Sequence, residues 1–217
     1  MTTLSGRLKS ETAELHRLAE RHPFQHDLIR GSLEPFRYRR FLKQLYFFHS
    51  GMDMAWSALP LETRILFPTQ GTIRGALLHD LYELGESPAT MSLGTSASQF
   101  ITELLELNET SAVGARYVFE GACNGGVFIS RAMRRHYGER CPPHRNLIPY
   151  GDAQKETWLK FQRGLDRVTA TSVEADAVVE AAKRTFRSFI MLMEEVVGFD
   201  VSVTLLSTRS KGARHVV

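Results

Sequence analysis

The chain has 217 residues, of which 43% are hydrophobic and 24% charged, and its formal net charge is +3. This balance is typical of one soluble folded domain, and the charge is too small to indicate a nucleic-acid-binding protein. No stretch reaches the roughly 18 apolar residues of a membrane span, and the N-terminus lacks the apolar core of a signal peptide, so we expect a cytoplasmic protein.

Helical periodicity dominates the first half of the chain. Proline and glycine punctuate it: Pro23 is expected to stop the first helix, Gly31 to end the second, and Ser32 to cap the third. The pattern predicts helices over residues 3–21, 24–30, 32–59 and 98–107, with one or two short helices within 65–94.

The second half continues the helical pattern. A long helix is predicted over 110–137, ended by Gly138, and another over 152–168, with a proline-rich loop between them. The spacing Thr171-x-x-Glu174 has the form of a capping box and predicts a last long helix that ends near Gly198. We therefore predict an all-α, single-domain bundle of about eight helices over 1–198, followed by a flexible tail over 199–217.

The first predicted helix holds a lysine and a histidine on one face. Lys9 and His16 are seven residues apart, which is two turns and about 10 Å along the axis. A heme presents an iron that an imidazole ligates and, at about that distance, anionic propionates that an ammonium pairs with. A packed or exposed histidine beside a solvated lysine has the same spacing, so the spacing alone leaves both interpretations open.

The long helix over 110–137 contains several interior glycines. Each is expected to cost about 1 kcal/mol relative to alanine. Gly114, Gly121 and Gly125 fall on one face, at spacings of seven and four residues. A bare face of this kind admits either the backbone of a neighbouring helix or a flat ligand.

Two segments resemble the heme oxygenase family. Residues 8–20 match the proximal-helix pattern Leu-Lys-x-x-Thr-x-x-Leu-His-x-x-Ala-Glu. Residues 117–126 are similar to the distal-helix pattern Tyr-Val-Leu-Glu-Gly-Ser-x-Leu-Gly-Gly of bacterial members, which they match at Tyr117, Val118, Glu120, Gly121, Gly125 and Gly126. By this resemblance the chain is identified as a bacterial-type, biliverdin-producing heme oxygenase with that family's helical fold.

The resemblance also implies a role for individual residues. His16 corresponds to the proximal iron ligand, and Gly121 and Gly125 to the distal wall over the porphyrin. The implied propionate contacts are Lys9, Tyr117, Arg184 and Arg187, with Lys183 beside the last two. A solvated basic face accounts equally well for the arginines of the last helix.

Three residues of the distal segment depart from the family pattern or suggest another role. Ala122 stands where bacterial members have serine and mammalian members a carboxylate. Asn124 replaces an apolar residue, and its amide is a candidate donor to a distal water or oxygen. Cys123 lies about 200° around the helix from Gly121, so we interpret it as a buried thiol and not as a heme ligand.

The predicted activity is cleavage of heme to biliverdin, carbon monoxide and ferrous iron. Heme is both substrate and cofactor, and a ferredoxin or an NAD(P)H-dependent reductase is the expected electron donor. A bacteriophytochrome that receives biliverdin is a further expected partner, and the position of Lys9 implies the α isomer. The alternative is a non-catalytic heme carrier or sensor on the same fold. Neither paired Glu-x-x-His helices nor a pocket cysteine favours a di-metal oxygenase or a thiaminase-like hydrolase.

Overall fold

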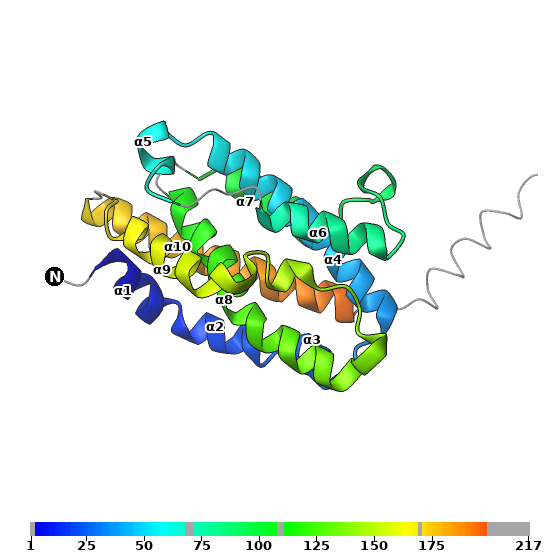
Figure 1. Ribbon diagram of the computed structural model, residues 1–217. Coiled ribbons are helices and arrows are strands. Elements are labelled where there is room, and N and C mark those ends of the chain that lie inside the picture. The colour runs from blue at the N-terminus through cyan, green and yellow to red at the C-terminus, as the bar shows by residue number, and fades with distance from the viewer. Residues whose placement is uncertain (1–2, 68–71, 108–110, 169–170, 199–217) are drawn as a thin grey trace, which may run out of the picture.

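The computed structural model of the protein describes residues 3–67, 72–107, 111–168 and 171–198 (Figure 1). Within these ranges the chain forms helices and no strand, which confirms the predicted all-α fold. The α-helices are α1 (Leu4–Glu11), α2 (Ala13–Glu20), α3 (Pro23–Arg30), α4 (Pro35–Ser57), α5 (Leu61–Arg64), α6 (Thr72–Glu83), α7 (Thr95–Leu105), α8 (Ser111–Tyr137), α9 (Gln154–Leu165) and α10 (Ser172–Val197). Short 3-10 turns lie at Pro88–Thr90, Gly138–Arg140, Arg145–Leu147 and Gly151–Ala153.

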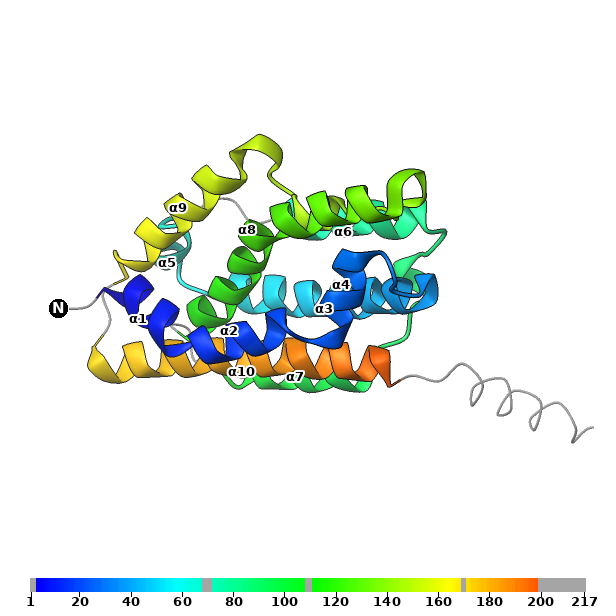
Figure 2. The same ribbon diagram turned by 90° about the horizontal axis from the view of Figure 1, so that it is seen from below.

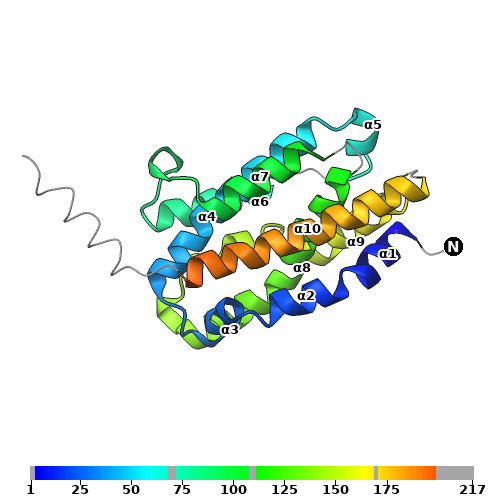
Figure 3. The ribbon, with the colours of Figure 1, turned by 180° about the vertical axis from the view of Figure 1, so that it is seen from behind.

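Helix α10 runs along one side of the bundle, next to α7 (Figure 2). Seen from behind, it crosses between a layer of α4, α6 and α7 and the α1–α2 segment (Figure 3). Helix α10 packs against α8, α7, α4 and α2, so one helix contacts most of the others. Aromatic rings fill the space around it, including the stacked pair Phe48 and Phe100, whose centroids are 4.3 Å apart, and Phe119 of α8.

The first predicted helix is divided in two, which corrects the expectation of a single helix over 3–21. Helix α1 ends at Glu11 and α2 begins at Ala13. The hydroxyl of the buried Thr12 donates to the carbonyl of Leu8 over 2.7 Å, and such bonds back to the preceding turn bend helices. Lys9 and His16 therefore lie on two consecutive helices, not on one continuous face.

The predicted helix ends are partly confirmed. Gly31 ends α3 with a φ of 74°, the left-handed conformation that favours glycine. The capping box of Thr171 and Glu174 opens α10 as expected. Ser32, however, does not cap α4: its hydroxyl bonds to Asp27, and Glu34 is the residue before the first turn. Because α4 begins at Pro35, three residues after Ser32, the Ser32 hydroxyl lies too far back to cap α4 and bonds to α3 instead.

Helix α8 is the longest element and bends near its middle (Figure 2). The bend falls in the glycine-containing part of the helix, and glycines are a recognised cause of such kinks. The predicted start at Thr110 and the predicted tail over 199–217 lie outside the described residues. None of the helices in the described part of the chain has the length and apolar character that crossing a bilayer requires.

Candidate functional site

His16 lies on α2 with its ring half in solvent. Its side chain is 55% exposed, and its Nδ1 lies 3.5 Å from Oε2 of Glu20, one turn further on. The ring meets Phe186 of α10 edge to face, with centroids 5.8 Å apart. Glu20 therefore favours the tautomer with a proton on Nδ1, and among the described residues no hydrogen bond engages Nε2.

A contact between Thr12 and Tyr117 brings the two sequence motifs to the same part of the fold. The Thr12 side chain hydrogen-bonds to the Tyr117 phenol, which opposes the rise in the pKa of Tyr117 caused by its burial. His16 lies one turn beyond Thr12, and Gly121 lies one turn beyond Tyr117. The turn before His16 and the turn before Gly121 therefore lie close together, although about a hundred residues separate them.

The glycines of α8 have different surroundings. A Cβ on Gly114 would overlap the carbonyl of Val178 in α10, and one on Gly126 would overlap the carbonyl of Leu147. A Cβ on Gly121 would meet only the ring of Trp158, at 3.6 Å, and one on Gly125 would have no neighbour within 4 Å. Packing therefore explains the first two glycines and leaves Gly121 and Gly125 unexplained.

The face of α8 that carries Gly121 and Gly125 continues into an exposed aromatic residue. Phe128 is seven residues beyond Gly121 and is 73% exposed. Asn124 is half-buried beside this face, and Ala122 is exposed. A bare helical face flanked by an exposed aromatic ring and an amide is suited to covering by a flat apolar ligand.

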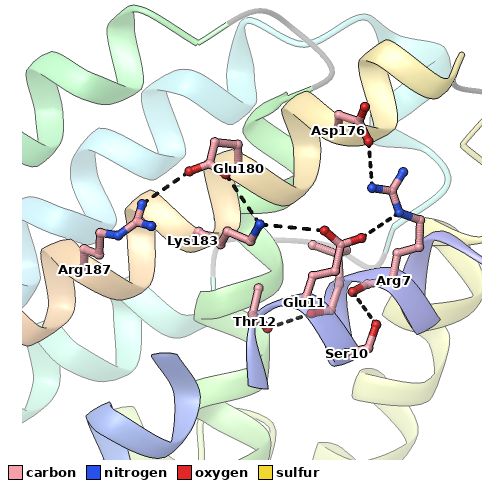
Figure 4. A network of polar contacts seen from close by, with 9 residues as sticks. Arg7, Ser10, Glu11, Thr12, Asp176, Glu180, Lys183 and Arg187 are labelled. Carbon is pink, nitrogen blue, oxygen red and sulfur yellow. Dashed lines mark hydrogen bonds and ion pairs between the residues drawn. The ribbon is translucent and has the colours of Figure 1, made fainter. Parts of the chain in front are cut away.

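The basic residues of α10 that are expected to hold propionates have different ion-pair partners. Lys183 faces α1 and interacts with Glu11 and Glu180 over 3.7 and 3.6 Å, and Arg187 pairs with Glu180 over 3.3 Å (Figure 4). Arg184 instead faces the end of α7, where it lies 3.6 Å from Glu106. Arg187 therefore belongs to the ion-pair cluster that reaches α1 through Glu180 and Lys183, whereas Arg184 pairs with the residue after α7.

The two remaining predicted propionate contacts differ in exposure. Lys9 is exposed on α1, and no ion pair engages it among the described residues. Tyr117 is only 9% exposed and packs against Trp158, with ring centroids 5.5 Å apart. Lys9 is thus accessible to a ligand, whereas Tyr117 presents at most its hydroxyl.

A family model described as heme oxygenase matches residues 2–195 of the chain. The chain belongs to the heme oxygenase family. A comparison with curated protein sequences finds no match.

Solved structures show the same fold. The heme oxygenase-1 of the cyanobacterium Synechocystis, solved in complex with heme, has a TM-score of 0.76 at 16% identity over 96% of this chain and 99% of its own. The heme oxygenase of Leptospira interrogans has a TM-score of 0.75 at 21% identity over 90% of this chain and 100% of its own. A TenA homologue from Pyrococcus furiosus has a TM-score of 0.71 at 15% identity over 89% of this chain and 99% of its own. At these identities the likeness shows the fold alone.

The residues present fit the heme that this family name implies. An imidazole with a carboxylate at Nδ1 and no partner at Nε2 is suited to ligate iron. The missing side chain at Gly125 leaves space against the backbone of α8 that a Cβ would occupy. Within the described ranges, no group of three His, Cys, Asp or Glu side chains could hold a metal ion without a porphyrin.

A buried ion pair lies directly beside the glycine segment and was not predicted from the sequence. Arg116 and Glu120 are each 1% exposed, and the guanidinium Nη2 lies 2.8 Å from Oε1 of the carboxylate. Tyr150 donates to Oε2 of Glu120 over 3.0 Å, and Asp53 lies 3.7 Å from Nη1 of Arg116. The spacing Arg116-x-x-x-Glu120 was the available signal, since residues four apart on a helix pair in this way.

The same charges affect neighbouring groups. Burial, together with the nearby cations Arg116 and Arg74, lowers the pKa of His49 to about 3. Burial also raises the pKa of the Cys123 thiol above its ordinary value. His49 is therefore neutral in the fold, and Cys123 is a buried thiol that is not poised to ligate iron, as its position on the helix predicted.

Three aromatic or acidic neighbours of the site also escaped sequence reasoning. They are Glu20 at Nδ1 of His16, Phe186 against the His16 ring, and Trp158 opposite Gly121. Glu20 had a signal in its spacing of four residues from His16. Phe186 and Trp158 had none, because only the packing of α10 and α9 brings them near α2 and α8.

Proposed function

We propose that this protein is a heme oxygenase in activity, which binds heme between α2 and α8 and cleaves it to biliverdin, carbon monoxide and ferrous iron. The observation that carries this proposal is that a chain of the heme oxygenase family has an accessible His16 on α2 and an uncovered Gly125 on α8. Neither feature is required by packing, and heme binding would account for both.

Each residue of the site has a specific role in this proposal. His16 would ligate the iron through Nε2, and Glu20, whose Oε2 lies 3.5 Å from Nδ1, would orient the ring. Gly121 and Gly125 let the porphyrin approach the backbone of α8, and Asn124 donates to distal water or oxygen. Heme supplies the activation of dioxygen, and no general base or nucleophile from the protein is needed.

The propionates would be held by charged and hydroxyl groups at the rim. Lys9 and the Tyr117 hydroxyl are the proposed contacts on the α1 and α8 sides, and Arg187 is the proposed contact on α10. Arg187 would have to exchange its pairing with Glu180 for a propionate, and Arg184 would have to leave Glu106. Lys9 therefore needs the least rearrangement.

Electrons would come from an acidic ferredoxin or from an NAD(P)H-dependent reductase. The second half of α8 and the turn after it carry exposed arginines that such a donor could approach, namely Arg131, Arg134, Arg135 and Arg140, with His136 among them. A bacteriophytochrome is the proposed recipient of the biliverdin. The proposals of an electron donor and of a biliverdin recipient both rest on the proposed heme oxygenase activity.

The test is hemin titration of the wild-type protein and of His16→Ala. We expect the wild type to bind about one hemin per chain, with a Soret band typical of a histidine-ligated, water-bound ferric heme. His16→Ala should lose that ligation and keep its helical circular dichroism. The control is His26→Ala, which removes an exposed histidine from the neighbouring α3. An unchanged Soret band in His16→Ala would contradict the assignment.

Turnover distinguishes an enzyme from a carrier. Addition of ascorbate or a ferredoxin system in air should convert the Soret band to the absorption of biliverdin, with release of carbon monoxide. A protein that binds hemin through His16 but leaves it intact would be the heme carrier or sensor instead. The departures at Ala122 and Asn124 make this second outcome worth measuring directly.

A further inference from the structure

Helix α9 places an indole beside the glycine segment of α8. A Cβ on Gly121 would lie 3.6 Å from Cη2 of Trp158, so the ring edge stands over the backbone at that glycine. Trp158 is held on its other sides by Tyr117, at a centroid distance of 5.5 Å, and by Phe161, at 6.0 Å and nearly parallel. The indole is therefore oriented by packing and only partly buried.

The start of α9 is fixed to α8 by the buried charge cluster. Tyr150 immediately precedes the turn Gly151–Ala153 that leads into α9, and its hydroxyl donates to both carboxylate oxygens of Glu120, over 3.2 and 3.0 Å. Glu120 is in turn held by Arg116, and the two side chains are almost fully buried. A charged pair at this depth is costly unless its hydrogen bonds are made, so this attachment has a defined geometry.

The residue of α8 that attaches α9 and the residue of α8 that faces the indole are adjacent in the chain. Glu120, which receives Tyr150, directly precedes Gly121, which faces Trp158. Loss of the Tyr150 hydrogen bond would release the first turn of α9 while leaving the hydrophobic contacts of Phe161 in place. Movement of α9 at this point would move the indole relative to Gly121.

We propose that Trp158 forms a wall of the porphyrin site and determines how the ring is seated, and that Tyr150 and Glu120 are positioning residues that hold it there. This inference rests on the proposed heme binding. It assigns the seating to α9 as well as to the propionate contacts, because a fixed indole beside Gly121 limits the rotation of a flat ligand that lies against α8.

The first experiment measures seating in the hemin complex without turnover. The proton NMR signals of the heme methyl groups, which are shifted by the ferric iron, report the fraction of each orientation. We expect Trp158→Ala to change the ratio of orientations by about two- to ten-fold, the range that one lost aromatic contact corresponds to. Trp158→Phe should restore part of the change. An unchanged ratio and an unchanged hemin dissociation rate in Trp158→Ala would overturn the proposal.

The second experiment tests the positioning residues in the absence of heme. Trp56 and Trp158 are the two tryptophans of the chain, so a Trp56→Phe background makes Trp158 the single fluorescent indole. Tyr150→Phe and Glu120→Gln in this background should increase acrylamide quenching of Trp158 and lower its anisotropy. The matched control is Tyr38→Phe, which removes a 2.8 Å hydrogen bond to Pro143 in the same connecting segment. Equal quenching in Tyr150→Phe and Tyr38→Phe would overturn the positioning role.

The two experiments separate this inference from the proposed function. If the wild type does not bind hemin through His16, the proposed function and the wall role of Trp158 both fail, and the fluorescence result still decides whether Tyr150 positions the indole. If hemin binds through His16 and Trp158→Ala leaves the ratio of heme orientations unchanged, the proposed function stands and only the wall role of Trp158 fails. Tyr150→Phe should also alter the seating ratio in the same direction as Trp158→Ala, an effect that a general loss of stability would not produce.

Discussion

The glycines of α8 form two pairs with opposite environments. Gly114 and Gly126 lie against the carbonyls of Val178 and Leu147, so any side chain would force two segments of backbone apart. Gly121 and Gly125, between them, meet a ring edge at van der Waals distance or nothing at all. One helix thus contains two glycines that packing requires and two that packing does not require. Identical residues on one helix are explained by different causes.

The largest expected effect is on the packed pair. Gly114→Ala and Gly126→Ala should each lower the free energy of unfolding by about 3 kcal/mol, because a methyl group cannot be fitted against a carbonyl without shifting a neighbouring segment. Urea unfolding followed by circular dichroism measures this loss. Wild-type stability in both variants would show that the contacts with Val178 and Leu147 relax freely.

The open pair should respond in the opposite direction. Gly125→Ala is expected to raise the free energy of unfolding by up to about 1 kcal/mol, because alanine has the higher helix propensity and its methyl group meets no neighbour. Gly125→Leu should also fold, yet bind hemin about ten-fold more weakly or not at all. Normal hemin binding by Gly125→Leu would mean that the porphyrin does not lie against this turn of α8.

The pH dependence of the free energy of unfolding tests the buried side of the site, where His49 lies. The pKa of His49 is about 3 in the fold and about 6.5 in an unfolded chain, so below pH 6.5 the unfolded state binds the extra proton. The contribution of neutral His49 to the free energy of unfolding is fully present above pH 6.5. It falls by up to about 1.4 kcal/mol per pH unit on acidification towards pH 3. His49→Leu should flatten this slope between pH 6.5 and 5, with the exposed His26→Leu as control. Equal slopes in the wild type and His49→Leu would contradict the neutral assignment.

The smallest expected effect concerns Lys9. Under the proposed function, wild-type turnover should yield mainly the α isomer of biliverdin, and Lys9→Ala should change the isomer ratio by about two- to five-fold. The effect is modest because Lys9 is exposed, and ion pairs in solvent contribute only about 0.2–1 kcal/mol. Chromatography of the extracted product measures the ratio. A predominantly β or δ isomer from the wild type would show that other contacts set the seating.

The sequence by itself determined the all-α fold, most helix positions and the helical character of the two motif segments, although not the break at Thr12. These follow from local signals: the apolar periodicity, the left-handed Gly31 and the capping box of Thr171 and Glu174. It also placed His16 and the glycines of α8 as candidate residues, since both carry local patterns. Two local predictions were wrong: a continuous helix through Thr12 and a helix cap at Ser32. In both cases the side-chain hydroxyl hydrogen-bonds to the preceding helix.

Only the tertiary structure decided what each candidate faces. The stripe of Gly114, Gly121 and Gly125 is uniform in sequence, and the crossing of α10 covers its first member while leaving its last member open. Likewise, Arg184 and Arg187 are one turn apart, yet Arg184 pairs with Glu106 after α7, whereas Arg187 pairs with Glu180 of α10 itself. Periodicity states which residues share a helical face, but which neighbour covers that face depends on contacts between segments far apart in the chain, and these contacts leave no local pattern in the sequence.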